Sequence, residues 1–301
     1  MQRLMIPEPK QHHSKLHPLP RRLRERLSKS SLAFVLVLAP LFATPAHGAS
    51  CSASSSGHRV ALLELYTSQG CNSCPPAERW LGGLQDRGTG TDKVVPLAFH
   101  VDYWDYIGWK DKFAQPGFSQ RQRLVATRNQ SSFIYTPQFV LNGKDFRRPW
   151  KKGRLADKLG PINANLSKVR IELQQVRKAN EVHVTVRADN SGRQRAHLFV
   201  ALYQNGLQTQ VKAGENAGKK LYHEFVVREL AGPVPVASGK TVGQEISFDL
   251  SPYQDLTSIG LAVFAEDAAS GETQQAMAIP LCGERADSES PAEPTIARLN
   301  G

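Results

Sequence analysis

Residues 60–77 read VALLELYTSQGCNSCPPA, and this stretch decides which fold the sequence predicts. Residues 60–66 are mostly apolar, which is typical of a strand buried on both faces. Residues 67–70 have the composition of a loop, and apolar residues then recur at helical spacing from 77 to 85. A second apolar run follows at residues 94–101. Strand, helix and strand in this order indicate a βαβ unit with two parallel strands.

The next segments extend this unit. A polar, helix-like stretch lies around residues 118–128, and a short strand is expected at 138–141. Asn142-Gly143 directly after that strand is a strong hairpin signal. Residues 151–159 are expected to form a closing helix. The sequence therefore predicts an α/β domain over residues 58–162.

The pattern changes after residue 166. Residues 169–176 and 182–188 alternate apolar and polar side chains, as half-buried antiparallel strands do. Short strands with turn residues between them continue at 196–203, 225–230, 246–250, 259–265 and 274–279. So many short strands predict an all-β, sandwich-like domain over residues 166–282. A polar, flexible tail is expected at 287–301.

Composition and charge narrow the functional classes. The 301 residues are 40% hydrophobic and 22% charged, as in ordinary globular proteins, which excludes collagen, coiled coil and wholesale disorder. Of the net charge of +11, residues 1–49 carry +6, from eight Lys or Arg against two Glu. The remainder shows no basic stripe interleaved with aromatic residues, so we expect no nucleic-acid partner.

The basic N-terminus has the pattern of an export signal. Residues 1–30 are basic, residues 32–43 are apolar, and small residues follow at 46, 48 and 49. This is typical of a bacterial signal peptide, here residues 1–49, although an uncleaved anchor is the alternative. The apolar run is too short to span a bilayer, and no longer run follows. We therefore expect a chain without stable membrane insertion, in the periplasm or secreted.

The four cysteines are Cys51, Cys71, Cys74 and Cys282. Disulfides persist outside the cytoplasm, and four cysteines permit three pairings. One close pair and two distant single residues favour Cys71–Cys74 and a structural bridge Cys51–Cys282. Intermolecular bridges, or cleavage after Cys51 that leaves Cys282 free, are the alternatives.

The C-x-x-C pair between a buried strand and a helix is the main candidate for chemistry. Amides at a helix N-terminus stabilise a thiolate, so Cys71 would attack a substrate sulfur and Cys74 would resolve the mixed disulfide. A zinc site built from two such pairs is excluded because the sequence holds no second C-x-x-C. An inert structural disulfide and a metal-binding pair remain as alternatives to redox chemistry in a thioredoxin-like fold.

Several motifs closely resemble those of the DUF1223 family, exported bacterial proteins related to thioredoxin. They are LLELYTSQGCNSCPPA at residues 62–77, HVDYWDY at 100–106, YTPQ at 135–138, and GEN at 214–216 leading to VVR at 226–228. The resemblance covers roughly residues 58–282. It implies a thioredoxin-like fold for the α/β domain and, by analogy of fold, exchange with protein thiols or disulfides.

The resemblance also implies roles for three residues outside the cysteine pair. Thioredoxin-like folds carry a cis proline opposite the reactive thiol, and the residue before it offers its backbone to an extended substrate. Thr136-Pro137 falls where that proline belongs, so both residues are expected to bind substrate; a plain trans proline is the alternative. Glu64 lies near the position of a buried acid that would deprotonate Cys74. Glu64 would otherwise pair with a nearby basic residue.

The segment after residue 100 supplies further candidates for substrate binding. His100, Asp102 and Trp104 follow the end of a predicted parallel strand, where open α/β sheets bind ligands. His100 would act as a base or metal ligand, and Asp102 and Trp104 would line a groove. The alternative is that the aromatic residues here simply pack a small core.

These observations predict a thiol–disulfide oxidoreductase that acts on protein cysteines and needs no cofactor or metal. Two other classes stay open. One is a copper-binding protein in which His100 completes a Cu(I) site with Cys71 and Cys74. The other is a non-enzymatic module whose β domain binds a partner.

Overall fold

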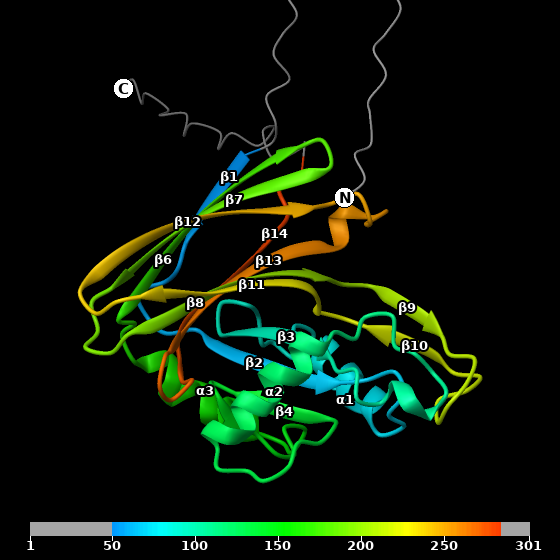
Figure 1. Ribbon diagram of the computed structural model, residues 1–301. Helices are drawn as coiled ribbons and strands as arrows, with labels where there is room; N and C mark the ends of the chain where they lie inside the picture. Colours follow the sequence, from blue (N-terminus) through cyan, green and yellow to red (C-terminus); the bar gives the residue numbers. More distant parts are fainter. Residues whose placement is uncertain (1–49, 284–301) are drawn as a thin grey trace, which may run out of the picture. The chain divides into compact units, whose positions relative to one another are not determined.

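The structure is a computed structural model that describes residues 50–283 (Figure 1). The predicted signal peptide (1–49) and the predicted tail (287–301) lie outside the described residues. The described part of the chain is mostly β, with fourteen strands in three sheets and three α-helices. No helix among residues 50–283 is both long enough and apolar enough to cross a membrane.

The first half of the chain forms the strand–helix–strand unit expected from its sequence. Strand β2 pairs in parallel with β3, and β4 runs antiparallel to β2 on its other side and turns into β5. The bounds of these elements are β2 (Ala61–Thr67), α1 (Cys74–Gly82), β3 (Val94–His100), α2 (Pro116–Arg128), β4 (Gln138–Leu141), β5 (Lys144–Asp145) and α3 (Arg154–Ala164).

The second half consists of strands. The predicted strands in this half are confirmed, and β9 and β10 are additional. Their bounds are β6 (Val169–Lys178), β7 (Glu181–Asn190), β8 (Ala196–Gln204), β9 (Leu207–Gln210), β10 (Lys220–His223), β11 (Val226–Val236), β12 (Lys240–Asp249), β13 (Ile259–Asp267) and β14 (Thr273–Pro280). Strand β1 (Ser50–Ser54), at the start of the described chain, pairs antiparallel with β6.

One sheet runs through both halves of the chain. Its eight strands lie in the order β14-β13-β8-β11-β3-β2-β4-β5, so β11 of the second half sits beside β3 of the first. The junction is short: Val226 is opposite Ala98, whose amide donates to the Phe225 carbonyl at 2.8 Å. The segments 58–162 and 166–282, predicted as successive domains, therefore share a sheet.

The two faces of β2 are packed by different helices. Leu63 and Leu65 face α1 and α3, whereas Leu62 and Tyr66 face α2. The core beneath α2 also contains Phe199 and other side chains from β8, β13 and β14. Because α2 covers strands from both halves, this core belongs to both predicted domains.

A second core lies between the eight-stranded sheet and a four-stranded sheet of order β1-β6-β7-β12. Alternate residues of β8, such as Leu198 and Val200, face this core, and Phe199 between them faces α2. Figure 1 shows β1, β6, β7 and β12 together on one side of β8 and β13, with the three helices on the other side. The second half is thus sandwich-like, as predicted.

Candidate functional site

The Cys71–Cys74 pair closes a small loop between β2 and α1. The two cysteines form a disulfide with their Cα atoms 5.4 Å apart, and Cys74 is the first residue of α1. Both cysteines are buried, at 1% and 0% exposure, while Asn72 and Ser73 between them are exposed. The hydroxyl of Ser73 lies 3.3 Å from the Cys71 sulfur. Cys71 therefore lies just before the N-terminus of α1, with a hydroxyl group beside its sulfur.

The loop is held by residues from the connection between β9 and β10. The side-chain amide of Asn216 donates to the backbone carbonyls of Gln69 at 2.8 Å and Cys71 at 3.0 Å. The Glu215 carboxylate accepts from the Asn72 amide at 3.1 Å. Asn216 is fully buried. The second half of the chain therefore braces the cysteine loop, although the sequence motif containing these two residues carried no assigned role.

Gln69 connects this loop to the interior. Its backbone amide donates to Asp111 at 2.8 Å, and its side-chain oxygen accepts from the Trp109 indole at 2.9 Å. An indole N–H is only a donor, so the Gln69 side-chain nitrogen must face Thr209 (3.0 Å) and His223 Nε2 (3.4 Å). That nitrogen donates, so His223 Nε2 accepts and the proton of His223 sits on Nδ1.

Behind the loop lies a buried cluster of three titratable residues, Glu78, His100 and His223. One Glu78 carboxylate oxygen accepts from Thr67 at 2.6 Å, and the other accepts from His223 Nδ1. His100 Nδ1 bonds to Asp111 at 2.7 Å. Their side chains come from α1, β3 and β10 and meet because β10 packs against α1. Glu78 and His223 were not found from the sequence; Glu78 follows Cys74 by one helical turn, which is the signal that could have found it.

Hydrogen bonds and neighbouring charges shift the pKa values of the groups in and beside this cluster. Burial opposes ionisation of Glu78, but the hydrogen bonds from His223 and Thr67 hold its pKa below the usual value. Burial likewise opposes protonation of His100, but the adjacent Asp111 carboxylate raises the pKa of His100. The pKa of Asp111 is lowered, because His100 and two backbone amides outweigh its own burial. Both acids are therefore carboxylates at neutral pH.

Glu64 lies in a different environment from the one expected for a carboxylate that deprotonates Cys74. It points to the α2 face of β2, between Leu63 and Leu65, which face α1. Arg121 of α2 donates to Glu64 at 2.6 Å and also pairs with Glu266. Burial raises the pKa of Glu64, although the Arg121 charge acts in the opposite sense. Because α1 begins at Cys74 and lies on the opposite face, the structure does not bring Glu64 and Cys74 together.

The structure brings some of the predicted substrate residues together and places others in structural contacts. The Trp104 indole donates to the Thr136 hydroxyl at 2.7 Å, and the Thr136–Pro137 peptide bond is cis, as expected. Asp102 instead accepts from the Ser119 hydroxyl on α2. Trp104 is half-buried and packs against the core under α2, so its ring has a packing role as well.

A hollow lies directly beside the cysteine loop. Two adjoining pockets of about 320 Å³ each share Pro137 and Trp150. The first is lined by Ser73, Pro76, Ala77, Trp80, Pro137 and Trp150. The second continues over Phe133, Tyr135, Phe139 and Phe146 to Arg147 and Arg148. Both pockets are mainly apolar, and Trp150 is 57% exposed at their shared edge.

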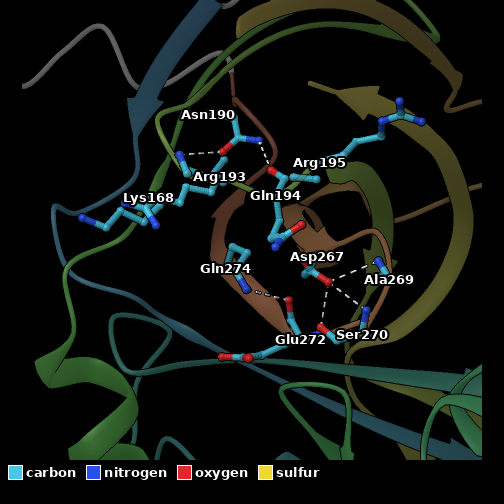
Figure 2. Close-up of a pocket in the computed structure, with 13 residues that line it drawn as sticks. Lys168, Asn190, Arg193, Gln194, Arg195, Asp267, Ala269, Ser270, Glu272 and Gln274 are labelled. Atoms are coloured by element: carbon cyan, nitrogen blue, oxygen red, sulfur yellow. Dashed lines mark hydrogen bonds between the residues drawn. The ribbon is translucent and has the colours of Figure 1, made fainter. Parts of the chain in front are cut away.

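A separate pocket of about 410 Å³ lies near the ends of β7, β8 and β13 (Figure 2). Lys168, Arg193 and Arg195 contribute positive charge to its lining. The Asp267 carboxylate is occupied by its own turn, where it accepts from Ala269 and Ser270. None of its lining residues belongs to the cysteine loop or to the buried cluster, so it is not part of the candidate site.

The other cysteine pair ties the start of the described chain to its end. Cys51 of β1 and Cys282, just after β14, form a disulfide with Cα atoms 6.2 Å apart. Gln175 lies opposite Cys51 in the β1–β6 pairing and accepts from the Cys282 amide at 3.1 Å. This disulfide therefore links the four-stranded sheet covalently to the segment after the final strand, away from the cysteine loop.

The fold and the site define a mostly β protein with a disulfide-closed C-x-x-C loop at the start of its first helix. The chain belongs to the DUF1223 family, described as proteins of unknown function, whose model matches residues 62–266. No curated protein sequence matches the chain.

Among solved structures, protein AGR_C_4864 from Agrobacterium tumefaciens is similar at 27% identity and a TM-score of 0.55. The match covers 78% of this chain and 100% of that one. HBP35 of Porphyromonas gingivalis is similar at 14% identity and a TM-score of 0.58, over 80% of this chain and 82% of that one. At that level of identity, HBP35 indicates a common fold alone.

Proposed function

We propose that this chain is an exported thiol–disulfide oxidoreductase that acts on protein cysteines through Cys71 and Cys74. The observation that carries the proposal is the disulfide between these residues at the N-terminus of α1, next to a groove that contains Pro137. The order β2-α1-β3-α2-β4-β5-α3, with β2 and β3 parallel, is also the order in thioredoxin-like domains. We assign residues 58–162 to that class on this basis.

The reaction is a pair of thiolate–disulfide exchanges. A substrate thiolate attacks the Cys71 sulfur, the Cys71–Cys74 bond breaks, and Cys74 leaves as a thiolate that takes a proton. A second substrate thiolate then attacks the substrate sulfur of the mixed disulfide and releases Cys71, so the substrate is oxidised and the protein is reduced by two electrons. The reverse sequence reduces a substrate disulfide, and the reduction potential of the pair sets the direction.

The apolar groove supports a protein rather than a small thiol as substrate. Trp80, Pro76 and Trp150 line its wall within reach of Ser73, which adjoins Cys74 in the chain. An extended peptide laid against Pro137 would place an apolar side chain in this hollow and its cysteine over the loop. Aromatic walls of this kind supply much of the binding energy at protein surfaces.

The burial of Cys71 implies that exchange requires a local opening of its loop. A sulfur at a residue that is 1% exposed cannot meet a protein thiol in line with the disulfide. Asn72 and Ser73 are exposed, and the Glu215 contact to Asn72 is at the surface. We therefore expect this contact to break when substrate binds.

The copper alternative gains no support from the position of His100. Within residues 50–283, the group of potential ligands that come within 4.8 Å of one another is Glu78, His100 and His223, and it includes neither cysteine. We therefore do not propose a Cu(I) site on Cys71, Cys74 and His100.

The test is disulfide exchange by the purified chain and two cysteine variants. The wild type should accelerate insulin reduction or the refolding of a scrambled protein, and Cys71→Ser should abolish this. Cys74→Ser should accumulate a mixed disulfide at Cys71, visible by mass spectrometry. The double variant Cys51→Ser/Cys282→Ser is the matched control and should keep its activity. A Cys71→Ser variant as active as wild type would falsify the proposal.

A further inference from the structure

We propose that Glu78, His100 and His223 form a binding site for one divalent metal ion, namely zinc or a similar divalent transition metal. The site is separate from the cysteines and does not depend on the proposed exchange activity. It is assembled by three elements, α1, β3 and β10, that are far apart in the sequence.

The positions of the ligand atoms carry the proposal. One ligand atom from each of Glu78, His100 and His223 lies within 4.8 Å of the other two. Ions of this class bind imidazole nitrogen and carboxylate oxygen at about 2.0–2.2 Å, so atoms around one ion lie about 3–4 Å apart. The three residues Glu78, His100 and His223 are 5%, 0% and 1% exposed, respectively. Small rotations of these side chains would therefore bring their ligand atoms to coordination distance. All three ligands are buried, so the site needs no surface residue.

An unpartnered nitrogen independently points to a missing ligand. His100 Nε2 is buried and has no hydrogen-bond partner, although buried polar atoms are nearly always paired. The other ring nitrogen of His100 bonds to the Asp111 carboxylate at 2.7 Å. A histidine held by a carboxylate through one nitrogen, with the other left open, is the usual arrangement of a metal-binding histidine.

The neighbouring residues orient the other two ligands. The Thr67 hydroxyl donates to the Glu78 oxygen that does not contact His223, at 2.6 Å. Gln69 faces His223 Nε2 at 3.4 Å, which leaves His223 Nδ1 directed at Glu78. An ion bound between His223 and Glu78 would replace the proton on His223 Nδ1, and that proton would leave to solvent.

Charge and ligand type select the ion. Two buried carboxylates lie in or beside the cluster. In the described part of the chain, Glu78 forms a salt bridge with His223, and Asp111, beside the cluster, forms one with His100. With both imidazoles neutral, a charge of +2 compensates the two carboxylates. Two imidazoles and a carboxylate suit zinc and its divalent neighbours, whereas Cu(I) prefers sulfur.

The first experiment uses the wild-type chain with both disulfides intact. After treatment with a chelator and its removal, the protein is titrated with ZnCl2 by calorimetry, and the zinc complex is studied by X-ray absorption. We expect one ion per chain, with two imidazole nitrogens and no sulfur around the zinc. Absence of binding at 100-fold excess of zinc over protein, or a sulfur neighbour, would overturn the proposal, and neither result requires a variant to fold.

The second experiment assigns the ligands. His100→Gln and His223→Gln should each weaken zinc binding at least 100-fold, and Asp111→Asn should weaken it about 10- to 100-fold through loss of ligand orientation. His183→Gln is the matched control, because His183 also contacts a hydroxyl and a carboxylate but is on the exposed face of β7. Unchanged binding in folded His100→Gln would refute the assignment. Cys71→Ser/Cys74→Ser should bind zinc as the wild type does, whatever its exchange activity.

Discussion

Asn216 donates from its side-chain amide to the carbonyl of Cys71 at 3.0 Å, although 145 residues separate the two in the chain. The same amide also donates to the Gln69 carbonyl. One fully buried side chain from the β9–β10 connection therefore satisfies two backbone carbonyls of the loop that carries the disulfide. The cysteine loop of the first half of the chain is thus held in place by the second half.

Replacement of Asn216 should destabilise the protein more than an ordinary loop substitution. Asn216→Ala removes both bonds, which leaves the Cys71 carbonyl with only the Cys74 amide at 3.2 Å and takes the side-chain donor from the Gln69 carbonyl. We expect a loss of about 2–4 kcal/mol in the free energy of unfolding. Asn165→Ala is the matched control, since Asn165 also donates to a carbonyl, that of Pro161, but at an exposed position. Water can replace that bond, so the control should lose less than about 1 kcal/mol. Urea unfolding measures both, and equal losses would contradict the bracing role.

Arg121 should be required to balance two buried acids. Its guanidinium pairs with Glu64 and Glu266 and lies over the rings of Phe199 and Phe264, with its carbon 5.0 and 5.1 Å from the ring centroids. Arg121→Met removes the charge and leaves both carboxylates buried, which should cost about 3–5 kcal/mol at neutral pH. Arg123→Met, on the exposed side of the same helix, should change stability by less than about 0.5 kcal/mol.

The loss in Arg121→Met should depend on pH in a defined direction. Burial already raises the pKa of Glu64 in the wild type, and the Arg121 charge opposes that rise. Without Arg121 the pKa of Glu64 rises further above that of the unfolded chain. Such a group stabilises the fold at low pH and loses this contribution as pH rises through its folded pKa. The difference between variant and wild type should therefore shrink from pH 8 to pH 5 in urea unfolding, and a constant difference would refute this account.

The Cys51–Cys282 bridge should contribute to stability without taking part in exchange. It closes a loop with a sequence separation of 231 residues. Restriction of so long a loop in the unfolded chain contributes about 5 kcal/mol on the chain-entropy model, and measured effects are often smaller. We expect Cys51→Ser/Cys282→Ser to lose about 2–5 kcal/mol in denaturant unfolding and to retain insulin reduction. Unaltered stability would show that the bridge does not restrain the chain.

Trp150 should matter for protein substrates more than for small thiols. It borders both pockets beside the cysteine loop and is 57% exposed. Trp150→Ala removes the shared wall, and we expect kcat/KM for a protein disulfide to fall about 10-fold, which corresponds to about 1.4 kcal/mol of binding energy. Reaction with dithiothreitol should be unchanged. Leu124→Ala is the control, because Leu124 is an exposed apolar residue on α2. An equal loss of activity with both substrates would show that Trp150 maintains the structure of the cysteine loop and does not bind the protein substrate.

The local elements of this protein could be predicted from the sequence because burial imposes a period on neighbouring residues. Uniform burial along β2 and β3 produces two apolar runs, and their parallel pairing follows from the helix between them. Alternating burial along β6 and β7 identifies them as half-exposed strands. The presence of one close cysteine pair and two distant cysteines indicated both disulfides.

Tertiary structure alone decided which elements meet. No local pattern places β11 beside β3 or β10 against α1, so neither the shared sheet nor the bracing by Asn216 was predictable. Glu64 shows the limit most clearly. Its place in an apolar strand predicted a buried acid, but the side of β2 it faces depends on register, and a shift of one residue reverses that side. In the structure, Glu64 pairs with Arg121. The acid that contacts His223 behind the cysteines is Glu78 on helix α1 instead. Sequence periodicity records how deeply each residue is buried, whereas the identity of its partner depends on contacts between segments that are far apart in the chain, 57 residues for Glu64 and Arg121 and 145 for Glu78 and His223.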